Sequence, residues 1–155
     1  MGVSGCGKTT IGKKMSEIVN YPFYDADSFH SIDNINKMKQ GIELDDSDRL
    51  AWLKMLSEKI DLWNKNGNSF LACSALKEKY RKVLSNGYIK DVSFMYLTID
   101  KTSAKSRILK RENHFFPVEL IDSQYKILEV NDNLINIDAN QSINNICKKI
   151  LELLE

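Results

Sequence analysis

Residues 2–9 have the types and the spacing that phosphate binding requires. The segment carries glycines at positions 2, 5 and 7, followed at once by a lysine and a threonine. Glycine allows tight turns and leaves no side chain between the backbone and a phosphate group. The N–H groups at the start of the helix that follows attract an anion, Lys8 can reach the β- and γ-phosphate oxygens of a nucleotide, and Thr9 can offer its hydroxyl to Mg²⁺. The pattern G-x-x-x-x-G-K-[ST] is that of the P-loop.

We therefore predict that one continuous run of residues binds the phosphates of ATP. Its members are Gly2, Val3, Ser4, Gly5, Cys6, Gly7, Lys8, Thr9 and Thr10. A chance match to the pattern arises in about one per cent of chains of this length. An amphipathic helix is predicted directly after the glycines, over 9–19, and this position favours phosphate binding over chance.

Two carboxylates, Asp25 and Asp27, follow the next short apolar segment. In open parallel sheets, ligands bind at the carboxyl ends of the strands, so we expect both side chains near the P-loop. One carboxylate can hold Mg²⁺ through water, and the other can accept the proton of an attacking hydroxyl. A pair of solvated or helix-capping aspartates explains the two residues equally well, and their position alone leaves both interpretations open.

Arg107 and Arg111 lie four residues apart on one predicted helix, and His114 follows them. Phosphoryl transfer needs positive charge over the γ-phosphate as negative charge develops there. Arginines at the edge of a mobile loop would supply that charge and would exclude water when the loop closes. The alternative is a basic, solvated helix face with a hydrogen-bonded structural histidine beside it.

Two further polar clusters lie at the ends of predicted elements. One contains Asp46, Asp48 and Arg49, and the other contains Lys77 and Arg81. A small, anionic, polyhydroxylated substrate would need such a mixture, with carboxylates for its hydroxyls and cations for its charge. The alternatives are helix caps for the first cluster and a surface stripe for the second.

The elements that must position these residues alternate between strands and helices. Short apolar segments bounded by turn residues predict strands at 23–25, 70–73, 92–99 and 134–137. Helical spacing of apolar residues predicts helices at 9–19, 32–40, 47–65, 76–84, 103–111 and 117–130, and a last helix after Ser142. Thr102 and Ser142 are the predicted caps of two of them. The alternation is typical of an α/β fold, a three-layer P-loop sandwich with a parallel sheet and helices on both faces, here as one domain over 1–155.

The sheet that this pattern predicts lacks one strand. A P-loop follows a buried strand, yet only Met1 stands before Gly2. Four strands are visible, and we expect a fifth of about five or six apolar residues in front of the P-loop. We expect the chain to be truncated there or its start to be misassigned, so that Met1 is the last residue of that strand. Filling of the position by another segment is the alternative.

The composition is that of an ordinary globular protein. The 155 residues are 43% hydrophobic and 28% charged, and the formal net charge is +1. So small a net charge gives no reason to expect nucleic acid or a membrane surface as the main partner. No apolar run approaches the roughly 18 residues of a membrane span. The three cysteines lie far apart, which is typical of reduced thiols in a cytoplasmic protein.

The order of these clusters resembles one family over nearly the whole chain, the small gluconokinases of the shikimate-kinase-like group of P-loop kinases. Beside the phosphate loop, several segments carry the resemblance. They are DADSFH at 25–30, NINKMKQG at 34–41, LDDSDRLAWL at 44–53, CSALKEKYR at 73–81, the lid-like segment 107–116, and 120–129 with Ser123-Gln124. The central segments are the specific ones, because other small kinases share the P-loop and Asp-x-Asp but not these.

The resemblance implies ATP-dependent phosphorylation of D-gluconate to 6-phospho-D-gluconate, a step that feeds the pentose phosphate pathway. It implies ATP and Mg²⁺ as cofactors, a homodimer in the cytoplasm, and a helical lid over about 107–125. It implies that Thr9 and Asp25 hold the metal and that Asp27 orients or deprotonates the substrate hydroxyl. Residues near 138–141 would face the adenine.

The family pattern also implies two sets of side chains around the reacting groups. The catalytic set is Lys8, Asp27, Arg107 and Arg111. The substrate-binding set is Asp27, His30, Asp48, Arg49, Lys77, Arg81 and His114. Two positions depart from the pattern, because Ala26 and Asn113 each stand where the family commonly has glycine. The alternatives are a kinase of another small hydroxylated metabolite, such as shikimate or a nucleoside, and a truncated inactive paralogue.

Overall fold

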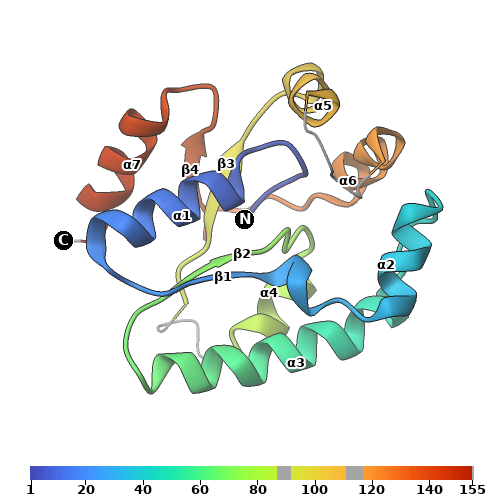
Figure 1. Cartoon of the computed structure of the whole chain (residues 1–155), viewed down its shortest axis with the longest axis horizontal. Coiled ribbons are helices and arrows are strands. Elements are labelled where there is room, and N and C mark those ends of the chain that lie inside the picture. The colour runs from blue at the N-terminus through green and yellow to red at the C-terminus, as the bar shows by residue number, and fades with distance from the viewer. Residues whose placement is uncertain (87–91, 111–116, 155) are drawn as a thin grey trace.

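A computed structural model describes residues 1–86, 92–110 and 117–154, and the remaining residues lie outside the description. Helices and strands alternate along the chain, as predicted (Figure 1). The helices are α1 (Lys8–Val19), α2 (Ile32–Lys39), α3 (Asp46–Asn64), α4 (Glu78–Leu84), α5 (Lys101–Leu109), α6 (Ile121–Ile127) and α7 (Ile143–Glu152). The strands are β1 (Phe23–Asp25), β2 (Phe70–Ala72), β3 (Met95–Thr98) and β4 (Ile135–Asp138), and short 3-10 helices lie at η1 (Ala26–Phe29) and η2 (Val118–Leu120).

The described strands form two parallel pairs. β1 pairs with β2, with Asp25 opposite Ala72, and β3 pairs with β4, with Thr98 opposite Asp138. Because each pair is parallel, the carboxyl ends of its two strands meet at the same edge. Asp25 therefore lies at the edge from which the loop after β2 departs, where the sequence analysis expects a ligand site.

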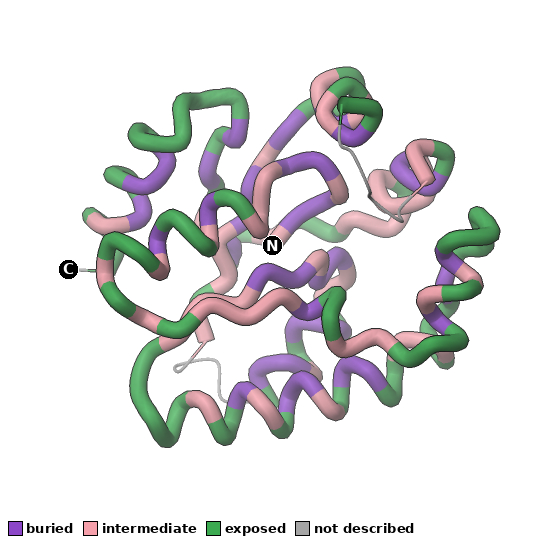
Figure 2. Tube along the Cα trace, in the orientation of Figure 1, coloured by how far each residue is buried: buried purple, intermediate pink, exposed green. Residues whose placement is uncertain are grey.

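Helices cover both sides of the strands, which gives three layers (Figure 1). The helices α1 and α7 pack against each other on one side, and α3 and α4 do so on the other. Each side has its own core. One core holds Met15, Ile137 and Ile146, and the other holds Leu56 and Leu84. In Figure 2 the buried residues line the faces of α1 and α3 that are turned toward the strands. The predicted α/β three-layer fold is confirmed.

Met1 and Gly2 connect the two strand pairs. The carbonyl of Met1 accepts a hydrogen bond from the N–H of Leu97 at 3.0 Å, and the N–H of Gly2 donates to the carbonyl of Ser74 at 3.1 Å. A cavity of about 310 Å³ lies between β2 and the residues leading into β3, with Leu71 and Phe94 among its lining. The fifth strand that the sequence predicts in front of the P-loop stays a prediction.

Local side-chain caps explain where several helices begin. Asp45 and Asp48 form a capping box at the start of α3, and Ser142 accepts from the N–H of Asn145 at the start of α7, as predicted. The predicted Thr102 cap is wrong. The helix α5 begins at Lys101, and the side chain of Asp100 accepts from the N–H of Ser103, so an aspartate two residues earlier satisfies the first turn.

One predicted helix is much shorter than expected. Residues 117–130 form η2 and then α6, which ends at Ile127 because Leu128 has an extended backbone. The next residue, Glu129, donates its N–H to the carbonyl of Leu76 at 2.8 Å and accepts a hydrogen bond from Arg81. These long-range bonds replace the intrahelical ones. Within the described ranges, every helix is too short or too polar to span a bilayer.

Candidate active site

The phosphate loop is built from backbone conformations that need glycine. Gly5 has φ +83°, and a Cβ there would lie 2.6 Å from the carbonyl oxygen of Ala104. Any side chain at this position would therefore clash with the backbone of α5. Gly7 has φ +100° and directly precedes α1. Among the described residues, no side chain caps α1, and the space where a Cβ of Gly7 would point is open. The first N–H groups of α1 are therefore available to an anion.

Lys8 folds back over this loop. Its ammonium donates to the carbonyls of Gly2 at 2.9 Å and Val3 at 3.0 Å. Val3 and Cys6 are themselves buried, at 1% exposure each, and so anchor the loop in the core. The arrangement places the Lys8 ammonium against the loop, and its contact with phosphate oxygens stays a prediction.

Thr9 and Asp25 meet across the gap between α1 and β1. The hydroxyl of Thr9 donates to Oδ2 of Asp25 at 2.8 Å. The other carboxylate oxygen of Asp25 accepts the N–H of Asp27 at 3.1 Å and caps η1. Asp25 is therefore both a helix cap and a neighbour of the P-loop threonine, which confirms the capping interpretation, while its role at a metal ion stays a prediction.

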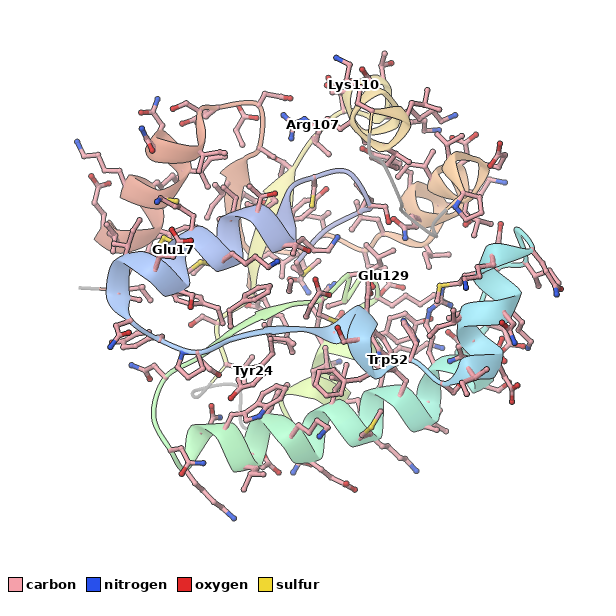
Figure 3. The ribbon with its side chains drawn as sticks, viewed as in Figure 1. Glu17, Tyr24, Trp52, Arg107, Lys110 and Glu129 are labelled. Atoms are coloured by element: carbon pink, nitrogen blue, oxygen red, sulfur yellow. The ribbon has the colours of Figure 1, made fainter. Side chains whose placement is uncertain are left out.

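Asp27 lies within η1, and His30 directly follows η1 as its C-cap residue. The carboxyl group of Asp27 is 49% exposed, and its Oδ1 lies 4.0 Å from Nε2 of His30, whose side chain is only 6% exposed. The His30 ring stacks on Trp52, with ring centroids 4.2 Å apart. Trp52 is labelled in Figure 3 and donates its Nε1–H to the carbonyl of Ala26 at 3.0 Å. A tryptophan of α3 thus supports the segment that carries Asp27.

Burial lowers the pKa of His30 from 6.5 to about 4, and the charge of Arg49 acts in the same direction. The imidazole is therefore neutral at neutral pH and can donate one hydrogen bond and accept another. Within the described part of the chain, its buried Nδ1 has no hydrogen-bond partner.

The first polar cluster lies at the beginning of α3. Asp48 completes the capping box and pairs with Lys37 at 2.6 Å, and the hydrogen bond from this lysine lowers the pKa of the carboxyl group. Arg49 donates to the carbonyl of Leu44, and its guanidinium lies 5.6 Å from the centre of the Tyr80 ring. Both side chains are held in place before any substrate binds.

The second cluster meets the first through Asp46. Its carboxylate accepts from Lys77 at 2.9 Å, and also from Lys79 and from the hydroxyl of Tyr80. These hydrogen bonds, that of Lys79 first, lower the pKa of Asp46. The sequence analysis treated the two clusters as separate. The structure connects them, because α3 and α4 pack side by side.

Arg81 is not a surface residue. Its side chain is buried, with 4% exposure of the residue, and burial lowers the pKa of the guanidinium. It donates to the carbonyls of Ala75 at 2.9 Å, Leu76 at 3.1 Å and Glu129 at 2.9 Å. Ala75 has φ +44°, which is an unfavourable conformation for alanine. Arg81 therefore holds the loop that leads to Lys77.

Arg107 extends from α5 toward the loop that follows β4 (Figure 3). Its guanidinium donates to the carbonyl of Ala139 at 2.8 Å, within the segment predicted to face adenine. Arg111 and His114 lie outside the described residues. The structure thus brings Thr9, Asp25 and Asp27 to one edge of β1, and it links the loop after β2 to the P-loop through the hydrogen bond between Gly2 and Ser74.

The three-layer fold and the phosphate loop are those of P-loop kinases, and they place this protein in that class. The shikimate kinase family model matches residues 4–155, and the chain belongs to this family. The family predicted from the sequence is confirmed.

Known proteins and solved structures match over almost the whole chain. The thermosensitive gluconokinase of Escherichia coli (strain K12) is 40% identical over 154 residues, which cover 96% of this chain and 82% of that protein. The unliganded structure of a sugar kinase from Janibacter sp. HTCC2649 has a TM-score of 0.91 and 40% identity, covering 99% of this chain and 91% of that chain. The structure of a gluconokinase from Sinorhizobium meliloti 1021 has a TM-score of 0.85 and 32% identity. The match covers 98% of this chain and 87% of that chain.

Proposed function

We propose that this protein is a gluconokinase, which transfers the γ-phosphoryl group of ATP to D-gluconate and releases ADP and 6-phospho-D-gluconate. The observation that carries the proposal is the hydrogen bond between Thr9 and Asp25, at 2.8 Å. It sets the phosphate loop against the carboxyl end of β1, in a chain that is 40% identical to a gluconokinase over 154 residues.

The nucleotide phosphates bind to the loop from Gly2 to Thr10, with Lys8 on the β- and γ-phosphates. Thr9 and Asp25 are the residues that would hold Mg²⁺. The donor set fits this ion, because a hydroxyl and a carboxylate oxygen in direct contact are the hard oxygen ligands that Mg²⁺ uses together with substrate phosphates. When bound, the ion neutralises charge on the phosphate oxygens.

Asp27 acts on the acceptor. Its half-exposed carboxylate accepts the proton of the gluconate hydroxyl while the hydroxyl oxygen forms its bond to the γ-phosphorus, and the bond from that phosphorus to ADP breaks. The neutral ring of His30 lies 4.0 Å from this carboxylate, beyond hydrogen-bond distance, on the same side of the proposed substrate. Arg107 and Arg111 stabilise the charge that develops on the transferred group.

The clusters around α3 and α4 recognise the substrate. Arg49 and Lys77 provide positive charge for the gluconate carboxylate, and Asp48 and His30 provide partners for its hydroxyls. Arg81 contributes through the loop that it holds, since its donors are engaged with backbone carbonyls. The substrate role of His114 and the lid over 107–125 stay predictions, as do the homodimer and the cytoplasmic location.

The identity of the product tests this proposal. The protein is incubated with ATP, Mg²⁺ and D-gluconate, and the phosphorylated product is analysed by mass spectrometry and ³¹P NMR. We expect a monophosphate ester on the terminal hydroxyl of gluconate. Phosphate esters on shikimate, in parallel reactions that leave gluconate unmodified, would favour the second candidate, a shikimate kinase, which the family model supports.

A further inference from the structure

A glutamine from a distant part of the chain binds the phosphate loop. Oε1 of Gln124 accepts the backbone N–H of Ser4 at 2.6 Å, and Nε2 of Gln124 lies 3.3 Å from the hydroxyl oxygen of Ser4. The two residues are 120 positions apart. The contact is bidentate, so it fixes both the position and the orientation of the Gln124 carboxamide.

The helix that presents this glutamine is firmly attached. In α6, Ile121 is fully buried, and the hydroxyl of Tyr125 donates to the carbonyl of Ile99 at 2.7 Å. Asp122 forms ion pairs with Lys101 at 3.3 Å and Lys105 at 3.0 Å on α5. Contacts on both sides of Gln124 therefore hold its backbone, and its side chain is directed to the loop by the fold.

The contact lies on the side of the loop that Lys8 covers. Lys8 donates to the carbonyl of Val3, the residue directly before Ser4. Under the proposed function, on which this inference rests, Lys8 binds the β- and γ-phosphates. Under the same proposal, Ser4 and Gln124 would lie beside the γ-phosphate, and the N–H groups at the start of α1 would face the β-phosphate.

We infer that Gln124 is a positioning residue for the transferred phosphoryl group. Through Ser4, its carboxamide holds the γ-phosphate side of the loop in the shape that transfer requires. A glutamine suits this place because it offers one acceptor and one donor without charge. A carboxylate would still accept from Ser4, but it would place negative charge beside the γ-phosphate.

Two variants of the full chain test the inference. Gln124→Ala removes both contacts, and we expect kcat to fall about tenfold with the KM for gluconate within about twofold of the unmodified protein. Gln124→Glu keeps the length and the acceptor, and we expect the Kd for ATP to rise about tenfold more than the Kd for ADP. Lys126→Ala, an exposed position on the same helix, is the control and should match the unmodified protein in all these measurements.

A purely structural role of Gln124 gives a different pattern. In that case, Gln124→Glu would change the Kd values of ATP and ADP by equal factors, and Gln124→Ala would keep kcat while its melting temperature fell. Either result overturns the inference. The measurements of the Kd for ATP and ADP need no gluconate, so they test this inference independently of which acceptor the enzyme uses. An unmodified protein that binds ATP but does not phosphorylate gluconate would overturn the proposed function alone.

Discussion

The hydroxyl of Thr9 donates a hydrogen bond to Oδ2 of Asp25 at 2.8 Å, which joins the first turn of α1 to the end of β1. This contact places the P-loop threonine beside the carboxyl end of β1, directly before the 3-10 helix η1 that carries Asp27. The predictions below depend on this arrangement and on the side chains that support it.

Thr9→Val should reduce the affinity for Mg²⁺. The substitution keeps the shape of the side chain but removes the hydroxyl, and we expect about 10- to 100-fold weaker activation by the metal. Initial rates at increasing Mg²⁺ concentration measure this effect. Thr9→Ser restores the hydroxyl and should restore most of the activation. A Mg²⁺ titration of Thr9→Val that coincides with that of the unmodified protein would show that Thr9 has no role at the metal.

Asp27→Asn should lower kcat by about 10² to 10⁴-fold, because an amide cannot accept the proton of the attacking hydroxyl. Lys8→Ala should abolish measurable turnover, since the phosphates lose their charged ligand. In Asp27→Asn, the circular dichroism spectrum and the melting temperature should stay close to those of the unmodified protein, because the carboxyl of Asp27 is half exposed. Unchanged rates in either variant would remove that residue from the catalytic set.

Arg81→Ala should destabilise the fold by about 2–4 kcal/mol, because three carbonyl groups lose a buried charged donor. Urea denaturation of the two proteins measures the difference. The neighbouring Lys82 is 69% exposed and pairs only with Glu78 among its described ion pairs, so Lys82→Ala is a matched control with little expected effect. Equal destabilisation by both substitutions would mean that Arg81 does not hold the loop.

His30 should make the fold sensitive to mild acid. Its pKa is about 4 in the folded protein and 6.5 as the ordinary value, so the unfolded chain binds the proton more readily. The free energy of unfolding should therefore be highest above pH 6.5 and should fall by up to about 3 kcal/mol as the pH drops from 6.5 to 4. Asp27 and Arg49 are the charged groups that face the ring.

His30→Phe provides the comparison for this pH dependence, since phenylalanine can stack on Trp52 but cannot take up a proton. We expect the loss of stability between pH 6.5 and 4 to be much smaller in this variant. Asp46 and Asp48, whose pKa values are lowered from 3.8, contribute stability that is lost only at still lower pH. The same slope in both proteins above pH 4 would assign the acid sensitivity to other groups.

Local patterns in the sequence were sufficient for the phosphate loop, the strand ending at Asp25 and the helix cap at Ser142. In each case the residues that act together lie within a few positions of one another, so spacing alone predicts the geometry. The parallel pairing of β1 with β2 followed from the alternation of strands and helices.

Contacts between distant segments could not be predicted in this way. Arg81 was predicted to bind substrate, and nothing in its neighbourhood indicated that it is buried against carbonyls as far away as Glu129. Tertiary hydrogen bonds at Glu129 also ended α6 early. The contact between Ser4 and Gln124 joins two segments that are 120 residues apart, and only the fold reveals it.

The most direct test of the proposed activity is ADP release by the chain with Mg·ATP, with D-gluconate and, separately, shikimate as acceptor. We predict release that depends on gluconate, is absent with shikimate, and is lost in Asp27→Asn. Release with shikimate and not with gluconate, or no release with gluconate from a folded chain that binds ATP, would contradict the assignment as a gluconokinase.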